Sequence, residues 1–166
     1  MDNTMEKALE QVLNAYRRYY TISTENVTPP FQAEAVFSQH DERYFLSKNL
    51  TLSESDSREY AFFAAVEKLD EDTFRKMDET AWNTGLSRVT PEWGMQGADV
   101  SLVLLADHID SGVKQLVKTA NRTKSYAFSL KGWSNYQVIA IELSTRNMSC
   151  NQLGQRMAET LCKILF

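Results

Sequence analysis

The feature that most constrains the fold is a run of apolar or small residues at positions 100–106. The run reads VSLVLLA, and Ser101 is its one polar member. A strand can be apolar along nearly its whole length only where both faces are covered, as in the centre of a sheet. The run therefore predicts a central strand, and the rest of the chain must supply its neighbours and its cover.

Three segments before this run have strand character. Residues 31–37 alternate apolar with mostly polar side chains, residues 44–46 read YFL after a polar turn, and residues 59–66 read EYAFFAAV. The short spacing between them favours an antiparallel meander, because parallel pairing needs a long crossover. Two later strands are expected at residues 125–130 and 136–143, joined by a hairpin-length loop at residues 131–135.

Helical periodicity of the apolar residues predicts four helices. The clearest covers residues 4–20. Asp70 and Asp110 are placed to cap the second and third helices, and Ser149 with Gln152 forms a capping pair for the last. The second helix is expected to bury one stripe of side chains: Phe74, Met77, Ala81 and Trp82.

Together these elements predict one α+β domain, with a mainly antiparallel sheet of about six strands flanked by about four helices. The domain spans residues 1–166. Residues 1–30 hold the N-terminal helix and an extended link, because Pro29 and Pro30 forbid helix, and residues 31–166 hold the sheet and the other helices. Three prolines and six glycines in 166 residues leave little room for a flexible linker.

Two observations bear on compartment. No apolar run approaches the roughly 20 residues of a membrane helix, and the first residues, MDNTME, lack the basic-then-apolar pattern of a secretory signal. Cys150 and Cys162 are the two cysteines, too few for a disulfide scaffold or a zinc site. We therefore expect a cytoplasmic protein with free thiols and no membrane contact. Gly-rich phosphate motifs are missing, so no cofactor is expected.

Charge is unevenly spread along the chain, whose formal net charge is −4. Residues 1–99 hold 18 acidic and 10 basic side chains, a net of −8, and residues 100–166 hold 4 acidic and 8 basic ones, a net of +4. Between Ser111 and Ile141 every charged residue is basic, namely Lys114, Lys118, Arg122, Lys124 and Lys131. This basic segment, residues 114–131, indicates either charge balance within one domain or a surface for an anionic ligand.

The candidate catalytic residues are Asp107, His108 and Asp110, which follow the expected central strand. Carboxylates and an imidazole at a strand end suit a metal or acid–base chemistry. A metal site needs at least one more ligand, which the sequence does not identify, so no bound metal is predicted. Residues 40–42 (HDE) offer the same chemistry at an expected turn, where solvated polar residues are common. Neither histidine accompanies a recognisable nucleophile motif.

The most unusual local segment is residues 131–135, which read KGWSN. A tryptophan in a hairpin loop beside a lysine can stack on a base or on a partner's side chain. Trp93, in a Gly-rich stretch, raises the same question. If Trp93 and Trp133 are exposed, they mark an interface, with Lys124 and Lys131 as its cations.

Several segments resemble an uncharacterised bacterial family found mainly in Firmicutes, a domain of unknown function. They are residues 44–48 (YFLSK), 59–63 (EYAFF), 124–133 (KSYAFSLKGW) and 138–143 (VIAIEL). This resemblance covers most of the chain from residue 31 onward and implies no activity, ligand or catalytic residue. In element order the chain is also similar to the small acidic dimeric chaperones of type III secretion, although the short helix at residues 110–120 departs from their pattern.

Three functional hypotheses follow. The first is a non-catalytic binding or adaptor module for a protein partner or a second copy, with contact through Trp93, Trp133 and the basic segment. The second is a metal-dependent hydrolase that uses Asp107, His108 and Asp110. The third is a single-stranded nucleic-acid binder through residues 114–131, although the acidic total argues against dedicated duplex binding.

Overall fold

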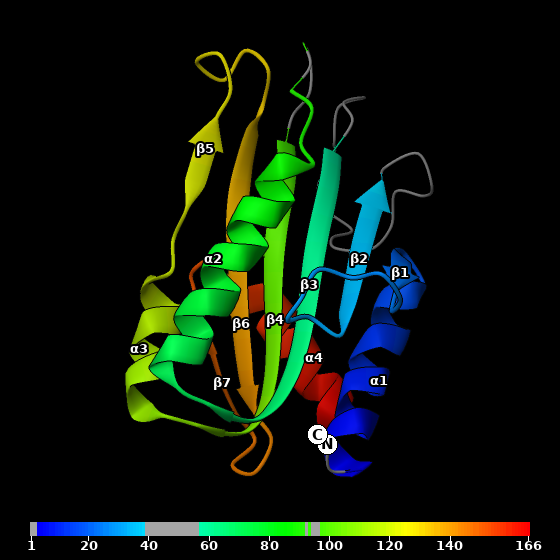
Figure 1. Cartoon of the computed structure of the whole chain (residues 1–166), viewed down its shortest axis with the longest axis vertical. Helices are drawn as coiled ribbons and strands as arrows, with labels where there is room; N and C mark the ends of the chain where they lie inside the picture. The colour runs from blue at the N-terminus through cyan, green and yellow to red at the C-terminus, as the bar shows by residue number, and fades with distance from the viewer. Residues whose placement is uncertain (1–2, 39–56, 92, 94–96) are drawn as a thin grey trace.

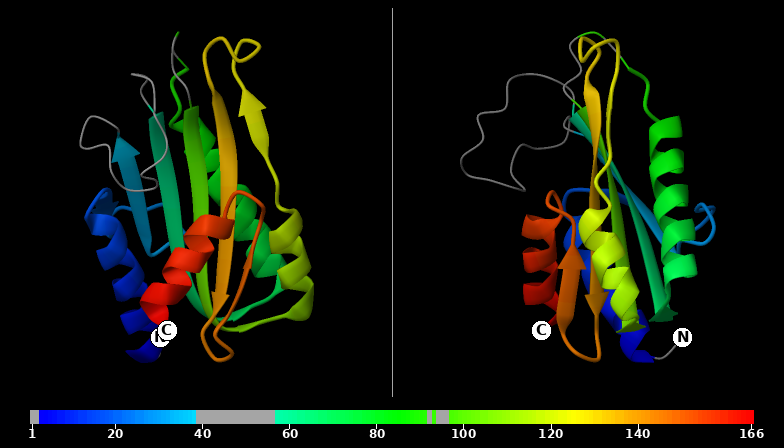
Figure 2. Two further views of the ribbon diagram at one scale, coloured as in Figure 1. Left: turned by 180° about the vertical axis from the view of Figure 1, so that it is seen from behind. Right: turned by 90° about the vertical axis from the view of Figure 1, so that its left-hand side faces the viewer.

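The fold is seen in a computed structural model that describes residues 3–38, 57–91, 93 and 97–166 (Figure 1). In chain order the elements are α1 (Asn3–Arg17), β1 (Thr21–Ser23), β2 (Ala33–Ser38), β3 (Ser57–Leu69), α2 (Glu71–Ser87), β4 (Gly97–Ile109), α3 (Ser111–Thr119), β5 (Thr123–Ser125), β6 (Trp133–Glu142), β7 (Asn147–Cys150) and α4 (Gln155–Leu165). They form an α+β domain of three layers, with α2 and α3 on one face of the sheet and α1 and α4 on the other (Figure 2).

The sheet of the described residues has seven strands in the order β1-β2-β3-β4-β6-β5, with β7 also pairing with β6. The α+β prediction is confirmed, but the sheet is mixed. β4 runs parallel to both β3 and β6, and the other four pairings are antiparallel. Parallel pairing of β3 and β4 is possible because α2 is long enough to carry the chain back along the sheet before β4 begins.

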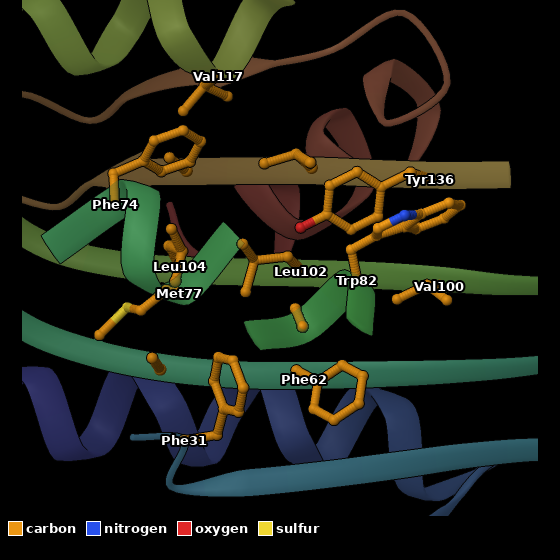
Figure 3. Close-up of a cluster of buried hydrophobic side chains, with 14 of the residues drawn as sticks. Phe31, Phe62, Phe74, Met77, Trp82, Val100, Leu102, Leu104, Val117 and Tyr136 are labelled. Carbon is orange, nitrogen blue, oxygen red and sulfur yellow. The ribbon is translucent and has the colours of Figure 1, made fainter. Parts of the chain in front are cut away.

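The predicted central strand is confirmed as the middle of β4. Every side chain from Val100 to Ala106 is buried. Because side chains alternate along a strand, the even positions face α2 and α3 and the odd positions face α1 and α4. Figure 3 shows the first of these two cores, where Trp82 of α2 packs on Tyr136 of β6 with 5.2 Å between ring centroids.

The second helix follows its sequence closely. Asp70 accepts a hydrogen bond from the backbone N–H of Thr73 at 2.8 Å, as an N-cap should. The predicted stripe is buried in full: Phe74, Met77, Ala81 and Trp82. Gly85 lies one turn later, where α2 comes so close to β4 that an added methyl group would be 2.5 Å from a Val100 methyl carbon.

The predicted strand at residues 125–130 is wrong. β5 ends at Ser125, and Ala127, Phe128 and Ser129 adopt φ angles of 48°, 54° and 68°. These left-handed conformations cannot continue a strand, so residues 126–132 form the turn. The predicted loop at residues 131–135 is also shifted, because Trp133 is already the first residue of β6.

The start of the last helix was also predicted too early. Ser149 lies in β7, a short strand that the sequence analysis missed along with β1, and α4 begins only at Gln155. Between β7 and α4, the buried side chain of Asn151 holds the backbone of three segments together. Its amide accepts from the N–H groups of Val138 and Gly154 and donates to the carbonyls of Tyr136 and Ala120. The predicted strand at residues 44–46 lies outside the described residues.

Candidate functional site

One end of the sheet carries a group of exposed apolar side chains. Four of the large hydrophobic residues that the described chain exposes come from the β5–β6 turn, the first position of β6 and the α2–β4 connection: Trp93, Phe128, Leu130 and Trp133. Together with Lys124 and Lys131 we call them the tip surface. It lies at the end of the molecule opposite the two termini, at the top of Figure 1.

Both predicted tryptophans reach solvent, although to different extents. Trp93 is 70% exposed, and Trp133 is 40% exposed because it pairs with Gly97 at the start of β4. The Lys131 ammonium lies 5.4 Å from the centroid of the Trp93 ring, within the range of a cation–π interaction. The structure thus brings Lys131 and Trp93 together. In the β5–β6 register Trp133 pairs with Ser125, and Lys124 is the residue before Ser125.

The turn that presents Phe128 has its own hydrogen bonds. The Tyr126 N–H donates to the carbonyl of Gly132 at 2.9 Å, and the Lys131 N–H donates to the carbonyl of Tyr126 at 3.1 Å. Phe128, at the apex, is 97% exposed. Its aromatic ring therefore contributes nothing to the core, and sequence reasoning missed it because it expected a strand there.

At the opposite end of the sheet, the structure brings two of the three predicted catalytic residues together. The Nδ1 atom of His108 lies 3.2 Å from Oε1 of Glu142, and its Nε2 atom lies 3.6 Å from Oδ1 of Asp110. Asp107 precedes His108 in β4, so its side chain leaves from the other face of the strand. Residues 40–42, the other histidine-containing candidate, lie outside the described residues.

Glu142 is the residue that sequence reasoning missed at this end. It is 2% exposed, and it accepts hydrogen bonds from Lys114 Nζ at 2.8 Å, the Ile109 N–H at 2.9 Å and the Thr145 hydroxyl at 2.7 Å. Burial acts to raise the pKa of Glu142, but these donors outweigh it and lower the pKa to about 2. A carboxylate held ionised in this way suits a structural ion pair better than a general base, whose pKa should lie near the working pH.

The basic segment is partly neutralised inside the fold. Lys114 pairs with Glu142, and Arg122 pairs with the largely buried Asp78 at 2.5 Å. Within the ranges that the structure describes, no three His, Cys, Asp or Glu side chains are grouped so that they could hold a metal ion. Of its five cations, two form internal ion pairs, two belong to the tip surface, and Lys118 lies in the last turn of α3.

A second set of polar side chains lies on the face of the sheet that α1 and α4 cover. Glu59 of β3 and Asp99 of β4 are register neighbours, and Glu59 accepts hydrogen bonds from the Tyr20 and Ser101 hydroxyls. Asp99 accepts from the Asn135 N–H on β6 at 3.0 Å. Burial raises the pKa of both carboxyl groups. We call Glu59 and Asp99 the carboxylate row. The one sign of it in the sequence is an acidic residue within a strand whose other residues are mostly apolar.

Both cysteines, Cys150 and Cys162, are free and half-buried, as expected. None of the helices in the described ranges combines the length and apolar character that a membrane crossing requires.

Residues 4–163 match a protein-family model that is described as a domain of unknown function. Comparisons with curated proteins and with solved structures each gave no match. The family match thus spans nearly the whole chain and brings no activity, ligand or partner with it.

Proposed function

The chain belongs to the DUF8052 family of domains of unknown function, and from this premise we propose that it is a non-catalytic module that binds a protein partner through its tip surface. The observation that carries the proposal is the grouping of Trp93, Phe128, Leu130 and Trp133 at one end of the fold. Monomeric proteins rarely expose clustered large apolar groups without a binding role. Aromatic residues also dominate the contact energy of protein interfaces.

The chemistry of the surface indicates the kind of partner. Lys124 lies over the Tyr126 ring and Lys131 over the Trp93 ring, so each ammonium sits beside an aromatic group. A polypeptide segment with an apolar side chain to cover the exposed aromatic rings and acidic residues on either side would satisfy both features. A second copy of the chain is the self-association form of the same proposal, and likeness to secretion chaperones belongs with that form.

A bacterial, cytoplasmic setting is part of the proposal. The pair of free thiols, Cys150 and Cys162, supports the cytoplasmic part, since structural disulfides are rare in reducing compartments.

Photo-cross-linking in cells tests the proposal. A benzophenone amino acid replaces Phe128 in one variant and Leu153, which is exposed but lies outside the tip surface, in the matched control. We expect a discrete protein adduct from position 128 that position 153 does not give. An adduct with the mass of two chains would select the self-association form.

Three outcomes would contradict the proposal. They are equal adducts from both positions, lipid as the one species captured at position 128, and sedimentation of the purified chain with anionic vesicles that Phe128→Ser abolishes. The last two would point to a membrane surface instead of a protein. Binding of a single-stranded oligonucleotide that weakens steeply with salt would favour the nucleic-acid hypothesis.

A further inference from the structure

The carboxylate row is chemically distinct from the tip surface, although Asp99 lies only two positions along β4 from Gly97, which Trp133 covers, and it calls for its own explanation. Glu59 and Asp99 stand opposite each other on adjacent parallel strands, so both side chains leave the same face of the sheet. Glu59 Oε2 accepts from the Tyr20 hydroxyl at 2.8 Å, and its Oε1 accepts from Ser101 Oγ at 2.5 Å. With Asn135 on β6, the row crosses the three central strands.

Glu59 is buried and Asp99 is partly buried, and neither has a compensating cation among the residues that the structure describes. The ion pairs of the described chain include Glu34 with Arg88 and Glu142 with Lys114, but neither Glu59 nor Asp99. The groups that face Glu59 are the Tyr16 hydroxyl from α1, the Tyr20 hydroxyl from the turn between α1 and β1, and the Ser101 hydroxyl and the acid Asp99 from β4. Buried carboxylates are normally paired with a cation, bound to a metal or protonated.

Tyr16 adds an independent observation. Its side chain is 1% exposed, and its hydroxyl has no hydrogen-bond partner among the described residues. Its ring packs against Tyr20 and Phe63, each at 4.8 Å between centroids, which places it beside the row. Burial, and after it the charge on Glu59, raises the pKa of Tyr16, so the hydroxyl lies within electrostatic reach of that carboxylate. An unpaired buried hydroxyl is costly, at about 1–3 kcal/mol.

We propose that the carboxylate row is a binding site for a hard divalent cation, Mg²⁺ or Ca²⁺. Its side-chain donors are all oxygens: two carboxylates and the hydroxyls of Ser101, Tyr20 and Tyr16. Oxygen donors select these ions over softer metals, and Mg²⁺ is commonly held by one or two carboxylates with water completing its shell. Two carboxylates also match the charge of the ion. The Tyr16 hydroxyl would gain its missing partner from a metal-bound water.

The test is calorimetric titration of the chelator-treated full chain with MgCl₂ and CaCl₂ at pH 7.5, alongside its thermal unfolding midpoint. We expect binding heat and a rise in the midpoint for the wild type. Asp99→Asn and Glu59→Gln should each weaken binding by at least about tenfold, and Tyr16→Phe should weaken it less. His108→Ala is the matched control, because it removes a metal-ligating side chain at the opposite end of β4 and should leave binding unchanged.

Two results would overturn the proposal. One is no heat and no midpoint shift for either ion up to about 10 mM, which exceeds the dissociation constants of weak calcium modules. The other is binding that survives in both Glu59→Gln and Asp99→Asn. Because Asp99→Asn changes the less buried of the two acids, it keeps the test decisive if Glu59→Gln fails to fold.

Discussion

The Lys131 ammonium lies over the Trp93 indole, 5.4 Å from its centroid, and so joins the β5–β6 hairpin to the α2–β4 connection. Exposed cation–π pairs contribute about 0.5–1 kcal/mol. We therefore expect Trp93→Ala and Lys131→Ala to lower the free energy of unfolding by no more than about 1 kcal/mol each, while both reduce the cross-linked adduct at position 128.

Trp133→Ala should destabilise more than Trp93→Ala, since its indole covers Gly97. Urea unfolding of the three variants measures this, and a Trp93→Ala loss above that of Trp133→Ala would contradict it.

The buried Glu142 carboxylate should contribute to the free energy of unfolding at neutral pH and lose this contribution in acid. Its folded-state pKa, about 2, is below its ordinary value of 4.5, so the folded state favours the ionised form. The stabilisation is present above pH 4.5 and is lost as the pH falls toward 2. Its size is about 1–2 kcal/mol, because Lys114 is partly exposed and water weakens its contribution. The unfolding free energies of the wild type and Glu142→Gln should converge between pH 4.5 and pH 2; a constant difference would contradict this.

Glu59 predicts the opposite pH dependence. Burial raises its folded-state pKa above 4.5, so the folded state binds a proton more tightly than the unfolded chain does. The free energy of unfolding should therefore fall as the pH rises from about 4.5 through the folded-state pKa. In chelator, Glu59→Gln should make this decline smaller and leave the part that comes from Asp99, whose pKa burial also raises. The variant should be at least as stable as the wild type at neutral pH, because the Tyr20 and Ser101 hydroxyls can re-orient toward an amide. A decline between pH 5 and pH 7 that is as large in Glu59→Gln as in the wild type would contradict the assignment.

Gly85 and Gly112 form a matched pair of helix glycines. An alanine at residue 85 gains helix propensity of about 0.8–1 kcal/mol, and an alanine at residue 112, in the first turn of α3, gains less. At residue 85 the new methyl group would meet both Val100 methyl carbons, at 2.5 and 2.7 Å, in a packed core. At residue 112 it would meet the far end of the half-exposed Glu71 side chain, which can swing away. We expect Gly85→Ala to destabilise by about 1–2 kcal/mol after this offset and Gly112→Ala to be near neutral; equal effects in thermal unfolding would refute the packing argument.

Among these substitutions of single polar side chains, Asn151→Ala should lower the free energy of unfolding the most. Asn151→Ala leaves the Val138 N–H and the Tyr136 carbonyl without their buried partner, and also frees Gly154 and Ala120. We expect a loss of about 2–4 kcal/mol in urea unfolding, since each unsatisfied buried group costs about 1–3 kcal/mol. Asn147→Ala, at the exposed start of β7, is the control and should change the free energy of unfolding by less than about 0.5 kcal/mol.

Elements whose signals are local could be predicted from the sequence. The apolar run at residues 100–106 requires cover on both faces, and Asp70 with its apolar stripe specifies α2. The turn after Ser125 could not be predicted from the sequence, because residues 126–130 (YAFSL) have the composition of a strand. Only the three positive φ angles in the structure reveal the turn. The parallel pairing of β3 with β4 depends on where α2 returns the chain, which no short segment encodes.

The candidate sites divide in the same way. Trp93 and Trp133 were noticeable by residue type, and their exposure is what the structure adds. Glu142 and Asn151 were missed because their roles depend on partners from α3 and β6 that are distant in sequence. Asp107, in contrast, was grouped with His108 by proximity along the chain, although alternation in a strand separates them.

The outer strands of the sheet that the structure describes are short, with three residues each in β1 and β5 and four in β7. Between β5 and β7, the Asn151 side chain occupies the backbone groups that β6 would otherwise offer. Long free edges are the usual templates on which chains polymerise, and short or filled edges suppress this. The described edges of the sheet therefore offer little backbone for pairing with another chain, whereas the tip surface exposes its apolar side chains. When many copies are crowded together, we expect encounters end to end and not fibrous growth along the sheet.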